Sequence, residues 1–395
     1  MIDDKVVLLA GARTPIGSFG GALKAVPAHE LGAHAVSAAL ARAGVEPTDV
    51  DEVVMGCIAQ NGPDAYNARR VAIAAGIATR TPAYTVNRLC GSGLQAIWSG
   101  AQQLLWSDDA RIVVAGGDES MSRTPFLDFE SRDNARLGDR RLVDGTLAIL
   151  TDPFTGQHMG HTAENVAERY GVSRLQQDEF AAESQRRAST DAASLAFADE
   201  IVPVEVGGRS PLTVSVDEHP RPGTTVEALS KLRPAFREGG SVTAGNSSGI
   251  NDGAAAVVLM RESDARAEGR RGLATLEAVT TAGIDPGYMG YAPVLALKRL
   301  FERTGVQPRE VDVVEVNEAF AAQAVAVVRD AGLDPDQTNP YGEAIALGHP
   351  VGATGAILML RAALTLQRRG SEYGVVTMCI GGGQALAALI RRWDG

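Results

Sequence analysis

The chain contains an internal repeat whose register holds, to within one residue, across about seventy residues. "GVEPTDVDEVVMG" begins at Gly44 and "GVQPREVDVVEVN" begins at Gly305, an offset of 261 residues. "RIVVAGGDES" at Arg111 and "YGVVTMCIGGG" at Tyr373 match at an offset of 262. Between these pairs, "CGSGLQAIWSGAQQLL" corresponds to "VGATGAILMLRAALTL" in the same register. Three matches in one register indicate a duplicated unit, so we expect two similar halves.

Each copy predicts strands that alternate with amphipathic helices. In the first copy, residues 5–14, 51–56 and 110–117 have strand character, whereas 28–44 and 92–105 have helical apolar spacing. The second copy repeats this order through "LATLEAVTTAG", "APVLALKRLFERTG", "DVVEVN", "TGAILMLRAALTLQRRG" and "EYGVVTMCI". The alternation is typical of a layered α/β protein and predicts parallel strands covered by helices on both faces.

A stretch of different character separates the copies. It contains charged loops and one clear helix start, where Ser173 and Gln176 form a capping-box pattern. "GINDGAAAVVLM" then reads as the last strand of the first half, as "QALAALIRR" does for the second. These signals predict a first half, an inserted loop domain and a second half, formed in that order by residues 1–121 with 246–272, 122–245 and 273–395.

Composition excludes several classes of protein. The 395 residues are 45% hydrophobic and carry a net charge of -11, which argues against nonspecific binding to nucleic acid or to an anionic membrane. No apolar run approaches the roughly 18 residues of a membrane-spanning helix, and "MIDDKVVLLA" opens with acids, so we expect neither a signal peptide nor an anchor. We therefore expect a cytoplasmic protein. Three cysteines without CxxC spacing suggest neither a disulfide scaffold nor a zinc site.

Four short segments lie where open α/β sheets place their sites, at the carboxyl ends of predicted strands. They are "NRLCGSG" at Cys90, "VNEAFAAQ" at Asn317, "ALGHPVGATG" at His349 and "MCIGGGQ" at Cys379. Each has a structural alternative: packing at a turn for Cys90, a helix cap formed with Glu318 for Asn317, an ordinary loop for His349 and a glycine turn for Cys379.

Taken together, the four segments favour chemistry. The duplication places the Cys90 and His349 loops at equivalent positions, and Gly91 and Gly93 beside Cys90 would let backbone amides approach a ligand. A helix N-terminus would favour a thiolate at Cys90. A nucleophile beside a base, with a second acid or base, is suited to covalent acyl transfer that includes a carbon-centred step.

These residues resemble the thiolase family, and in particular its acetyl-CoA acetyltransferases. The resemblance runs nearly end to end through "ARTPIGSFGG", "NRLCGSGLQAI", "GGDESMS", "HMGHTAENVA", "KLRPAF", "VTAGNSSGINDGAAAVV", "VNEAFAAQ", "GEAIALGHPVGATGA" and "CIGGGQA". It implies the thiolase fold, in which two βαβαβαββ halves form layers and the first half carries an inserted loop domain. This arrangement agrees with the repeat found above.

The resemblance also implies a role for each reactive residue. Cys90 would accept the acetyl group, and His349 would take its proton. Cys379 would remove the α-proton of a second acetyl-CoA, while His349 and a water held by Asn317 would stabilise the enolate. The backbone N–H groups of Cys90 and Gly381 would hold the oxyanion of the acylation step. The implied reaction is the reversible condensation of two acetyl-CoA to acetoacetyl-CoA and CoA.

By the same resemblance, CoA should lie largely on the inserted domain, as a substrate. No cofactor beyond CoA thioesters and no metal is implied, and a homo-oligomer, either a dimer or a tetramer, is expected. The expected CoA-binding residues are His158, Met159, Arg221, Phe236, Ala244, Ser248, Met289, Ala319 and Phe320.

Some positions depart from the common family pattern and bear on specificity. Glu343 stands where glycine is common, Thr354 replaces a common serine, and Ala385 follows the glycine run where another glycine is frequent. The 61–70 loop also differs. The His158-Met159 pair favours a short-chain enzyme over the alternative of a broader 3-ketoacyl-CoA thiolase of fatty-acid β-oxidation.

Two alternatives come from other classes of protein. A noncatalytic acyl-CoA-binding protein would be expected to lose its reactive residues, whereas all four segments are intact here. A nucleotide-dependent oxidoreductase would need a strand-linked GxGxxG motif with an acidic residue about twenty positions later, and the sequence lacks one.

Overall fold

A computed structural model describes residues 4–107, 109–133, 137–208 and 211–395 of the chain. Within this part, ten strands form one sheet in the order β12-β13-β14-β11-β1-β10-β5-β3-β4, with β2 (Gly17–Ser18) paired to β10. The other strands of the sheet are β1 (Val6–Arg13), β3 (Glu52–Gly56), β4 (Ala83–Val86), β5 (Ile112–Ser120), β10 (Asn251–Arg261), β11 (Ala274–Gly283), β12 (Val313–Val316), β13 (Tyr373–Ile380) and β14 (Gln384–Arg392).

The duplication is visible in the strand pairing. In the first half β10 pairs with β5 and β1, and in the second half β14 pairs with β13 and β11. The halves meet where β1 pairs antiparallel with β11, with Val7 opposite Thr275. The counterpart of β4 is reduced to a single parallel bridge between Val314 and Thr338.

The prediction of parallel strands is correct only at the two edges of the sheet. The pairs β3/β4, β3/β5 and β12/β13 are parallel, but the pairs among β13, β14, β11, β1, β10 and β5 are antiparallel. The reason is connectivity. The three residues 381–383 that join β13 to β14 form a hairpin, and a short turn can only reverse the chain direction. The repeat gives β10 the equivalent position beside β5.

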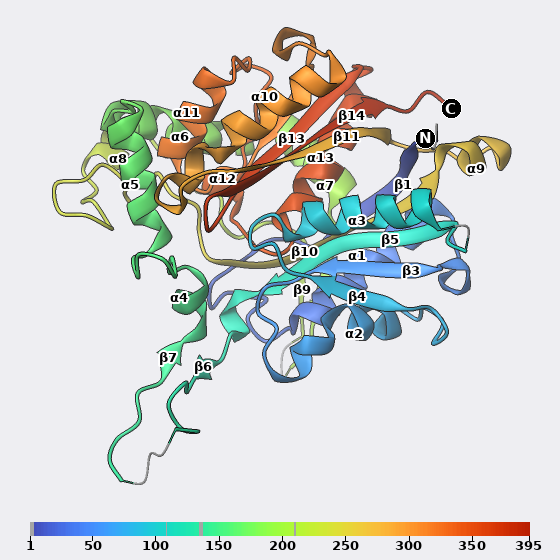
Figure 1. Ribbon diagram of the computed structural model, residues 1–395, viewed down its shortest axis with the longest axis horizontal. Coiled ribbons are helices and arrows are strands. Elements are labelled where there is room, and N and C mark those ends of the chain that lie inside the picture. Colours follow the sequence, from blue (N-terminus) through green and yellow to red (C-terminus); the bar gives the residue numbers. More distant parts are fainter. Residues whose placement is uncertain (1–3, 108, 134–136, 209–210) are drawn as a thin grey trace.

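Helices cover the sheet in layers (Figure 1). Helix α13 (Thr354–Arg369) is buried along nearly its whole length, contacts strands of both halves and packs against α3 (Ser92–Trp106). On the other faces, α1 packs on β1 and β10, and α10 packs on β11 and β14. The remaining helices of the two halves are α1 (Ala28–Ala43), α2 (Asn67–Ala74), α9 (Glu262–Ala267), α10 (Ala292–Thr304), α11 (Ala321–Asp330) and α12 (Ala344–Leu347).

Glycines let α3 and α13 approach at their N-terminal ends. A Cβ on Gly93 would lie 2.8 Å from the Ala356 backbone nitrogen, and one on Gly355 would lie 2.4 Å from that of Leu94. Any larger residue would force the helices apart. Short 3₁₀ helices complete the framework at η1 (Pro47–Asp49), η2 (Gly62–Tyr66), η3 (Met121–Arg123), η4 (Pro286–Tyr291) and η5 (Pro308–Glu310).

The segment between β5 and β10 packs mainly against the second half. Its helices α5 and α6 contact α11, and α6 also contacts α12. The predicted capping box at Ser173 and Gln176 is present at the start of α6. The elements of this segment are β6 (Phe126–Leu127), β7 (Val143–Asp144), α4 (Gly145–Ile149), α5 (Met159–Arg169), α6 (Arg174–Ala188), α7 (Asp191–Glu200), β8 (Val204–Val206), β9 (Leu212–Val214) and α8 (Val226–Ser230).

One buried ion-pair cluster joins the inserted segment to both halves. The Glu200 carboxylate at the end of α7 lies 2.6 Å from the Arg13 guanidinium of β1 and 3.1 Å from that of Arg361 on α13. All three side chains are almost fully buried. Among the described residues, no helix has the length and apolar character needed to cross a membrane.

Candidate active site

Cys90 lies in a tight turn between β4 and α3. Leu89, immediately before it, has a left-handed backbone with φ of 48°, which a leucine rarely adopts. Ser92 holds this turn, because its hydroxyl donates to the Leu89 carbonyl at 2.6 Å and accepts the Arg88 N–H at 2.9 Å. Strained backbone that is fixed in this way is frequent at functional sites. Cys90 is only partly buried and lines a cavity.

The glycines beside Cys90 allow the second half of the chain to pack closely against the turn. A Cβ on Gly91 would lie 2.5 Å from the Ile380 side chain, and one on Gly93 would meet the backbone of α13. The second half therefore occupies the side of each glycine where a Cβ would lie, and this packing was not predicted. The close contact at Gly91 brings the end of β13, and with it Gly381, up to the Cys90 turn.

The glycine run after Cys379 divides into two roles. Gly382 and Gly383 have φ of 77° and 80° and form the β13–β14 turn, a conformation that other residues rarely adopt. Gly381 lines the cavity beside Cys90. Burial raises the pKa of the Cys90 thiol to about 11, although hydrogen bonds from the Gly381 and Cys90 amides lower it. The raised pKa makes the thiol the resting form, so Cys90 needs a base to become a thiolate.

His349 is almost fully buried and faces the same cavity. Its Nδ1 lies 2.6 Å from the Thr354 hydroxyl, while its Nε2 has no hydrogen-bond partner among the described residues. Burial lowers the pKa of the imidazole to about 4, so the ring is neutral at physiological pH. The segment before His349 is α12 rather than the predicted strand, because this part of the second half retains only the bridge at Thr338.

Two residues from separate elements hold the His349 segment in place. The side-chain oxygen of Asn251, on β10, accepts the His349 N–H at 2.9 Å. The Glu119 carboxylate, at the end of β5, accepts the N–H groups of Gly352 and Ile58 at 2.9 and 3.1 Å. Burial raises the pKa of Glu119 to about 7, although these hydrogen bonds lower it. The first half therefore fixes the loop that carries the histidine of the second half.

Asn317 and Cys379 are fully buried and are not among the residues that line the cavity. The Asn317 N–H donates to the Thr377 carbonyl. The N-cap of α11 is Phe320, so Asn317 does not cap this helix. Neither polar atom of the Asn317 side chain has a partner among the described residues. Burial and the neighbouring Cys90 raise the pKa of the Cys379 thiol. An unpaired buried amide is costly unless it binds something, so Asn317 is suited to hold a ligand or a water.

The cavity beside Cys90 has a volume of about 390 Å³ and extends over the inserted segment. Its lining includes Cys90, His349 and Gly381 together with every CoA-binding residue predicted from the sequence: His158, Met159, Arg221, Phe236, Ala244, Ser248, Met289, Ala319 and Phe320. The structure thus brings these residues to one surface, although they come from segments far apart in the sequence.

Aromatic rings and one cation shape the outer part of this cavity. His158 stacks on Phe236 with ring centroids 4.8 Å apart, and Phe236 meets Phe320 edge to face at 6.0 Å. Gly160 makes this stack possible, since a Cβ there would lie 2.2 Å from the Phe236 ring. The Arg221 guanidinium has no ion-pair partner among the residues that the structure describes, which leaves it available to an anionic group.

Several lining residues were not predicted. Met121, Ile149 and Leu150 form an apolar wall with Leu89 and Val351 around Cys90. His219 and Ser247 also line the cavity. No local pattern marks the apolar residues, because isolated hydrophobic positions in loops acquire their role only from the contacts that the fold creates.

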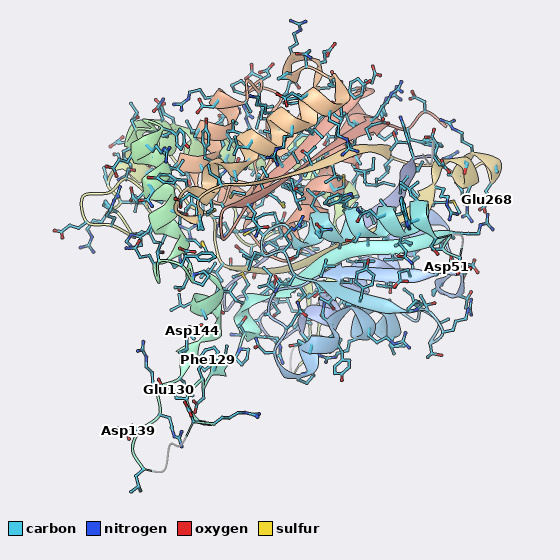
Figure 2. All side chains as sticks on the ribbon, viewed as in Figure 1. Asp51, Phe129, Glu130, Asp139, Asp144 and Glu268 are labelled. Carbon is cyan, nitrogen blue, oxygen red and sulfur yellow. The ribbon has the colours of Figure 1, made fainter. Side chains whose placement is uncertain are left out.

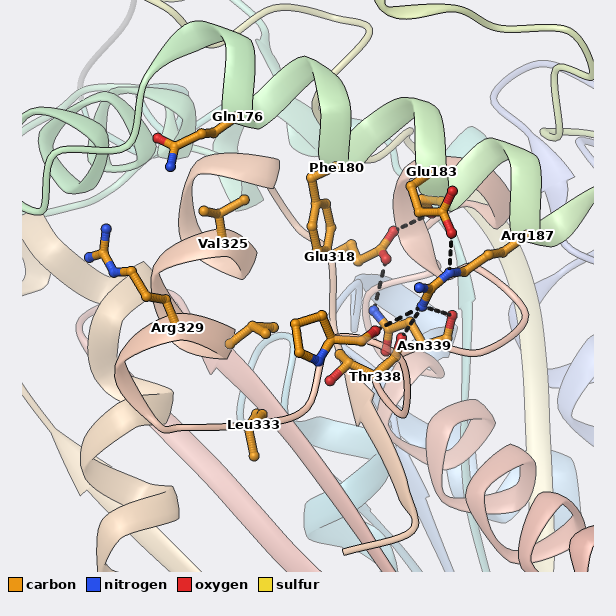
Figure 3. Close-up of a pocket in the computed structure, with 13 residues that line it drawn as sticks. Gln176, Phe180, Glu183, Arg187, Glu318, Val325, Arg329, Leu333, Thr338 and Asn339 are labelled. Atoms are coloured by element: carbon orange, nitrogen blue, oxygen red, sulfur yellow. Dashed lines mark hydrogen bonds and ion pairs between the residues drawn. The ribbon is translucent and has the colours of Figure 1, made fainter. Parts of the chain in front are cut away.

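A second cavity of about 410 Å³ lies between α6 and α11 (Figure 3). Phe180 and Val325 contribute apolar walls, and Glu318 and Asn339 lie at its inner end. The Arg187 guanidinium in its wall is already paired with Glu183 at 2.7 Å. Its lining includes none of the predicted site residues.

Comparison with known proteins agrees with this architecture. The family model described as "Thiolase, N-terminal domain" matches residues 6–263, and "Thiolase, C-terminal domain" matches residues 270–392. The chain is 52% identical to the beta-ketothiolase BktB of Cupriavidus necator over 98% of this chain and 99% of that protein. It is 46% identical to the acetyl-CoA acetyltransferase of Pseudomonas aeruginosa, with the same coverage of both chains.

Solved structures show the same similarity in three dimensions. The Bacillus anthracis acetyl-CoA acetyltransferase superposes with a TM-score of 0.96 at 42% identity, over 99% of both chains. The human mitochondrial 3-ketoacyl-CoA thiolase in complex with CoA gives a TM-score of 0.95 at 42% identity, over 100% of this chain and 99% of that one. The chain therefore belongs to the thiolase family. It has the thiolase fold and is an acyltransferase, as the resemblance implied.

Proposed function

We propose that this protein is an acetyl-CoA C-acetyltransferase, which condenses two acetyl-CoA reversibly into acetoacetyl-CoA and CoA through an acetyl-Cys90 intermediate. The observation that carries the proposal is the single cavity that joins Cys90, His349 and Gly381 to all nine predicted CoA-binding residues. The curated relatives named as acetyl-CoA acetyltransferases support acetyl transfer, and the similarity to a CoA-bound thiolase supports an acyl-CoA substrate.

In the first half-reaction, Cys90 needs a base because its thiol is protonated at rest. His349 has an unpaired Nε2 at the same cavity and takes that proton. The Cys90 sulfur attacks the thioester carbonyl, and the N–H groups of Cys90 and Gly381 bind the developing oxyanion. Each such donor contributes about 2.7–4 kcal/mol to lowering the barrier. The bond to the CoA sulfur then breaks, and the proton on His349 leaves with CoA.

In the second half-reaction, a new carbon–carbon bond forms. Cys379, as its thiolate, removes the α-proton of a second acetyl-CoA, while its own former proton resides on His349. The enolate oxygen is stabilised by protonated His349 and by a water that Asn317 holds. The enolate carbon attacks the carbonyl of acetyl-Cys90, and the released Cys90 thiolate recovers the proton from His349. Protons and charges balance over the cycle.

The substrate tail is held by the inserted segment in this proposal. The guanidinium of Arg221 supplies a positive charge for the phosphates of CoA, and the stack of His158 on Phe236 shapes the entrance. The apolar wall of Met121 and Leu150 faces the short acyl group. The reaction as proposed uses only groups of this chain and its thioester substrates.

We also propose a homo-oligomer in the cytoplasm. Support for association comes from the excursion formed by β6 and β7, which extends away from the rest of the molecule (Figure 1). It displays Phe126, Phe129 and Leu142, which are 65%, 70% and 55% exposed, and Figure 2 shows Phe129 and Glu130 on this excursion. Exposed apolar groups of this kind mark interaction surfaces. Light scattering after size-exclusion chromatography will distinguish a dimer from a tetramer.

The acyl-chain profile tests the proposed function. The rate of thiolysis of acetoacetyl-CoA is expected to exceed that of a C8 3-ketoacyl-CoA, and acetyl-CoA alone should acetylate Cys90, as detected by peptide mass spectrometry. A strong preference for the C8 substrate would favour the broader 3-ketoacyl-CoA thiolase. An acetyl label on another residue, or no label, would contradict the covalent mechanism.

A further inference from the structure

Glu343 occupies an unusual position for a carboxylate. It is the residue that precedes α12, the short helix that leads directly to His349, and it is only 2% exposed. One of its carboxylate oxygens accepts the backbone N–H of Glu318 at 2.7 Å. Glu318 directly follows Asn317 in the chain. The side chain of Glu343 therefore connects the segment of Asn317 with the segment of His349.

Glu318 in turn contacts the segment that contains Glu343. Its carboxylate accepts the Ile345 N–H of α12 at 3.3 Å and the Ser184 hydroxyl of α6 at 2.6 Å. The other carboxylate oxygen accepts the Asn339 side-chain amide at 2.8 Å, and Figure 3 shows these two side chains pointing toward one another. Ser184 also accepts the Glu343 N–H at 3.2 Å. Two reciprocal carboxylate contacts and one hydroxyl thus join three separate segments.

The rest of the Asn317 segment is anchored to other parts of the second half. The Asn317 N–H binds the Thr377 carbonyl of β13, and its carbonyl accepts the Gln323 amide of α11 at 3.2 Å. Asn339 binds both backbone groups of Val316. None of these contacts involves α12. The carboxylates of Glu318 and Glu343 are therefore the groups that fix the Asn317 segment relative to α12, the helix that precedes His349.

We propose that Glu343 is a positioning residue that fixes Asn317 relative to His349 for the carbon–carbon step. This inference rests on the proposed function, in which those two residues stabilise the same enolate oxygen.

The charged surroundings of Glu343 favour the uncharged form. Glu318 faces it from the Asn317 segment, Glu315 lies on β12 and Cys379 on β13, while Arg361 on α13 provides the opposing positive charge. Arg187 on α6 acts on Glu318. Burial raises the pKa of Glu343, and repulsion from Glu318 raises it further. Ionisation at alkaline pH would place two negative charges side by side without water, which would weaken the contact between the two segments.

Three substitutions at this position test the proposal. Glu343→Gln keeps an uncharged acceptor of nearly the same size, so kcat should stay within about threefold of the wild-type value. Glu343→Ala removes the acceptor and Glu343→Asp withdraws it by one methylene, so kcat for condensation should fall by about 10- to 100-fold, as expected for a small misplacement of catalytic groups. KM should change little, because Glu343 does not line the CoA cavity.

Two readouts separate positioning from a general structural role. Acetylation of Cys90 by acetyl-CoA should remain near the wild-type rate in all three variants, since only the second step uses Asn317. The wild-type kcat should decline on the alkaline side, and this decline should be absent in Glu343→Gln. If Glu343→Ala fails to fold, the kcat of Glu343→Asp tests the proposal in its place.

An unchanged kcat in Glu343→Ala, or in Glu343→Asp if the alanine variant does not fold, would overturn the inference. So would a fall in kcat of Glu343→Gln as large as that of the other variants, or an effect on KM alone. Loss of Cys90 acetylation in parallel with kcat, or an alkaline decline in kcat that persists in Glu343→Gln, would also overturn it. Failure of the proposed function is distinguishable, since the wild-type protein would then neither acetylate Cys90 nor condense acetyl-CoA.

Discussion

The imidazole Nδ1 of His349 lies 2.6 Å from the hydroxyl of Thr354, and the second hydrogen bond of that hydroxyl, to the Pro350 carbonyl, indicates the tautomer of the ring. The hydroxyl has one hydrogen, which it donates to the Pro350 carbonyl at 3.0 Å. The Thr354 oxygen then accepts a hydrogen bond from the Nδ1–H group. The lone pair is left on Nε2, the nitrogen without a partner, where a base for Cys90 is needed.

Thr354→Val should therefore reduce kcat while Thr354→Ser should not. Valine keeps the size of threonine but removes the acceptor that orients the ring, and the loss of one such hydrogen bond corresponds to about 1.4 kcal/mol, or about tenfold in rate. Serine retains the hydroxyl. Steady-state kinetics with a thermal-unfolding control measure the difference, and equal activity in the two variants would contradict the assigned tautomer.

The reactivity of Cys90 should increase steadily with pH. Because burial raises the pKa of its thiol to about 11, the thiolate fraction in the free enzyme should grow about tenfold per pH unit across the neutral and mildly alkaline range. The rate of alkylation by iodoacetamide measures this fraction, with Cys90→Ala giving the background from Cys57 and Cys379. A plateau near neutral pH would instead indicate a thiolate already stabilised at rest.

Substitution of Cys379 should abolish the second half-reaction and leave the first intact. Cys379→Ala should still form acetyl-Cys90, because the base for that step is His349. It should fail to exchange the α-protons of acetyl-CoA with deuterated water, because the base for the second step is gone. Mass spectrometry of the peptide and of the substrate reports the two results independently. Retained exchange would show that another group removes the α-proton.

The buried Glu200 should dominate the stability of the junction between the inserted segment and the two halves. Glu200→Ala leaves two buried arginines without their shared carboxylate, so the free energy of unfolding should fall by about 3–5 kcal/mol. The control is Glu227→Ala, which removes an exposed ion pair with Lys231 and should cost less than about 1 kcal/mol. Similar losses from both variants in chemical denaturation would show that the cluster does not hold the junction.

The repeat was sufficient to predict the duplicated halves, because strands and helices of both copies follow local patterns such as the spacing in α1 and α13. It could not predict the antiparallel centre of the sheet, which depends on the way the chain returns after a hairpin. The candidate reactive residues could be named because glycines and polar groups follow apolar runs at the carboxyl ends of predicted strands. Domain boundaries and the roles of individual site residues stay predictions until the experiments above are done.

The residues that sequence reasoning missed act over long separations. Asn251 binds the backbone of His349 across 98 positions, and Glu119 reaches Gly352 across 233. Leu89 looks like an ordinary apolar residue, yet its left-handed backbone sets the direction of Cys90. Such properties arise from the assembled fold, since no local pattern distinguishes these residues from others of their type.

The contact of α3 with α13 through Gly93 and Gly355 has a consequence for how such a protein can diversify. The two copies touch backbone to backbone where their reactive loops begin, so neither can drift in sequence there without displacing the other. We therefore expect sequence changes to concentrate in the inserted segment, which forms the outer cavity and does not contribute to the contact between Gly93 and Gly355. Selection for activity on new acyl-CoA substrates should accordingly yield substitutions at residues such as Met121, Ile149 and Leu150, and none at Gly93 or Gly355.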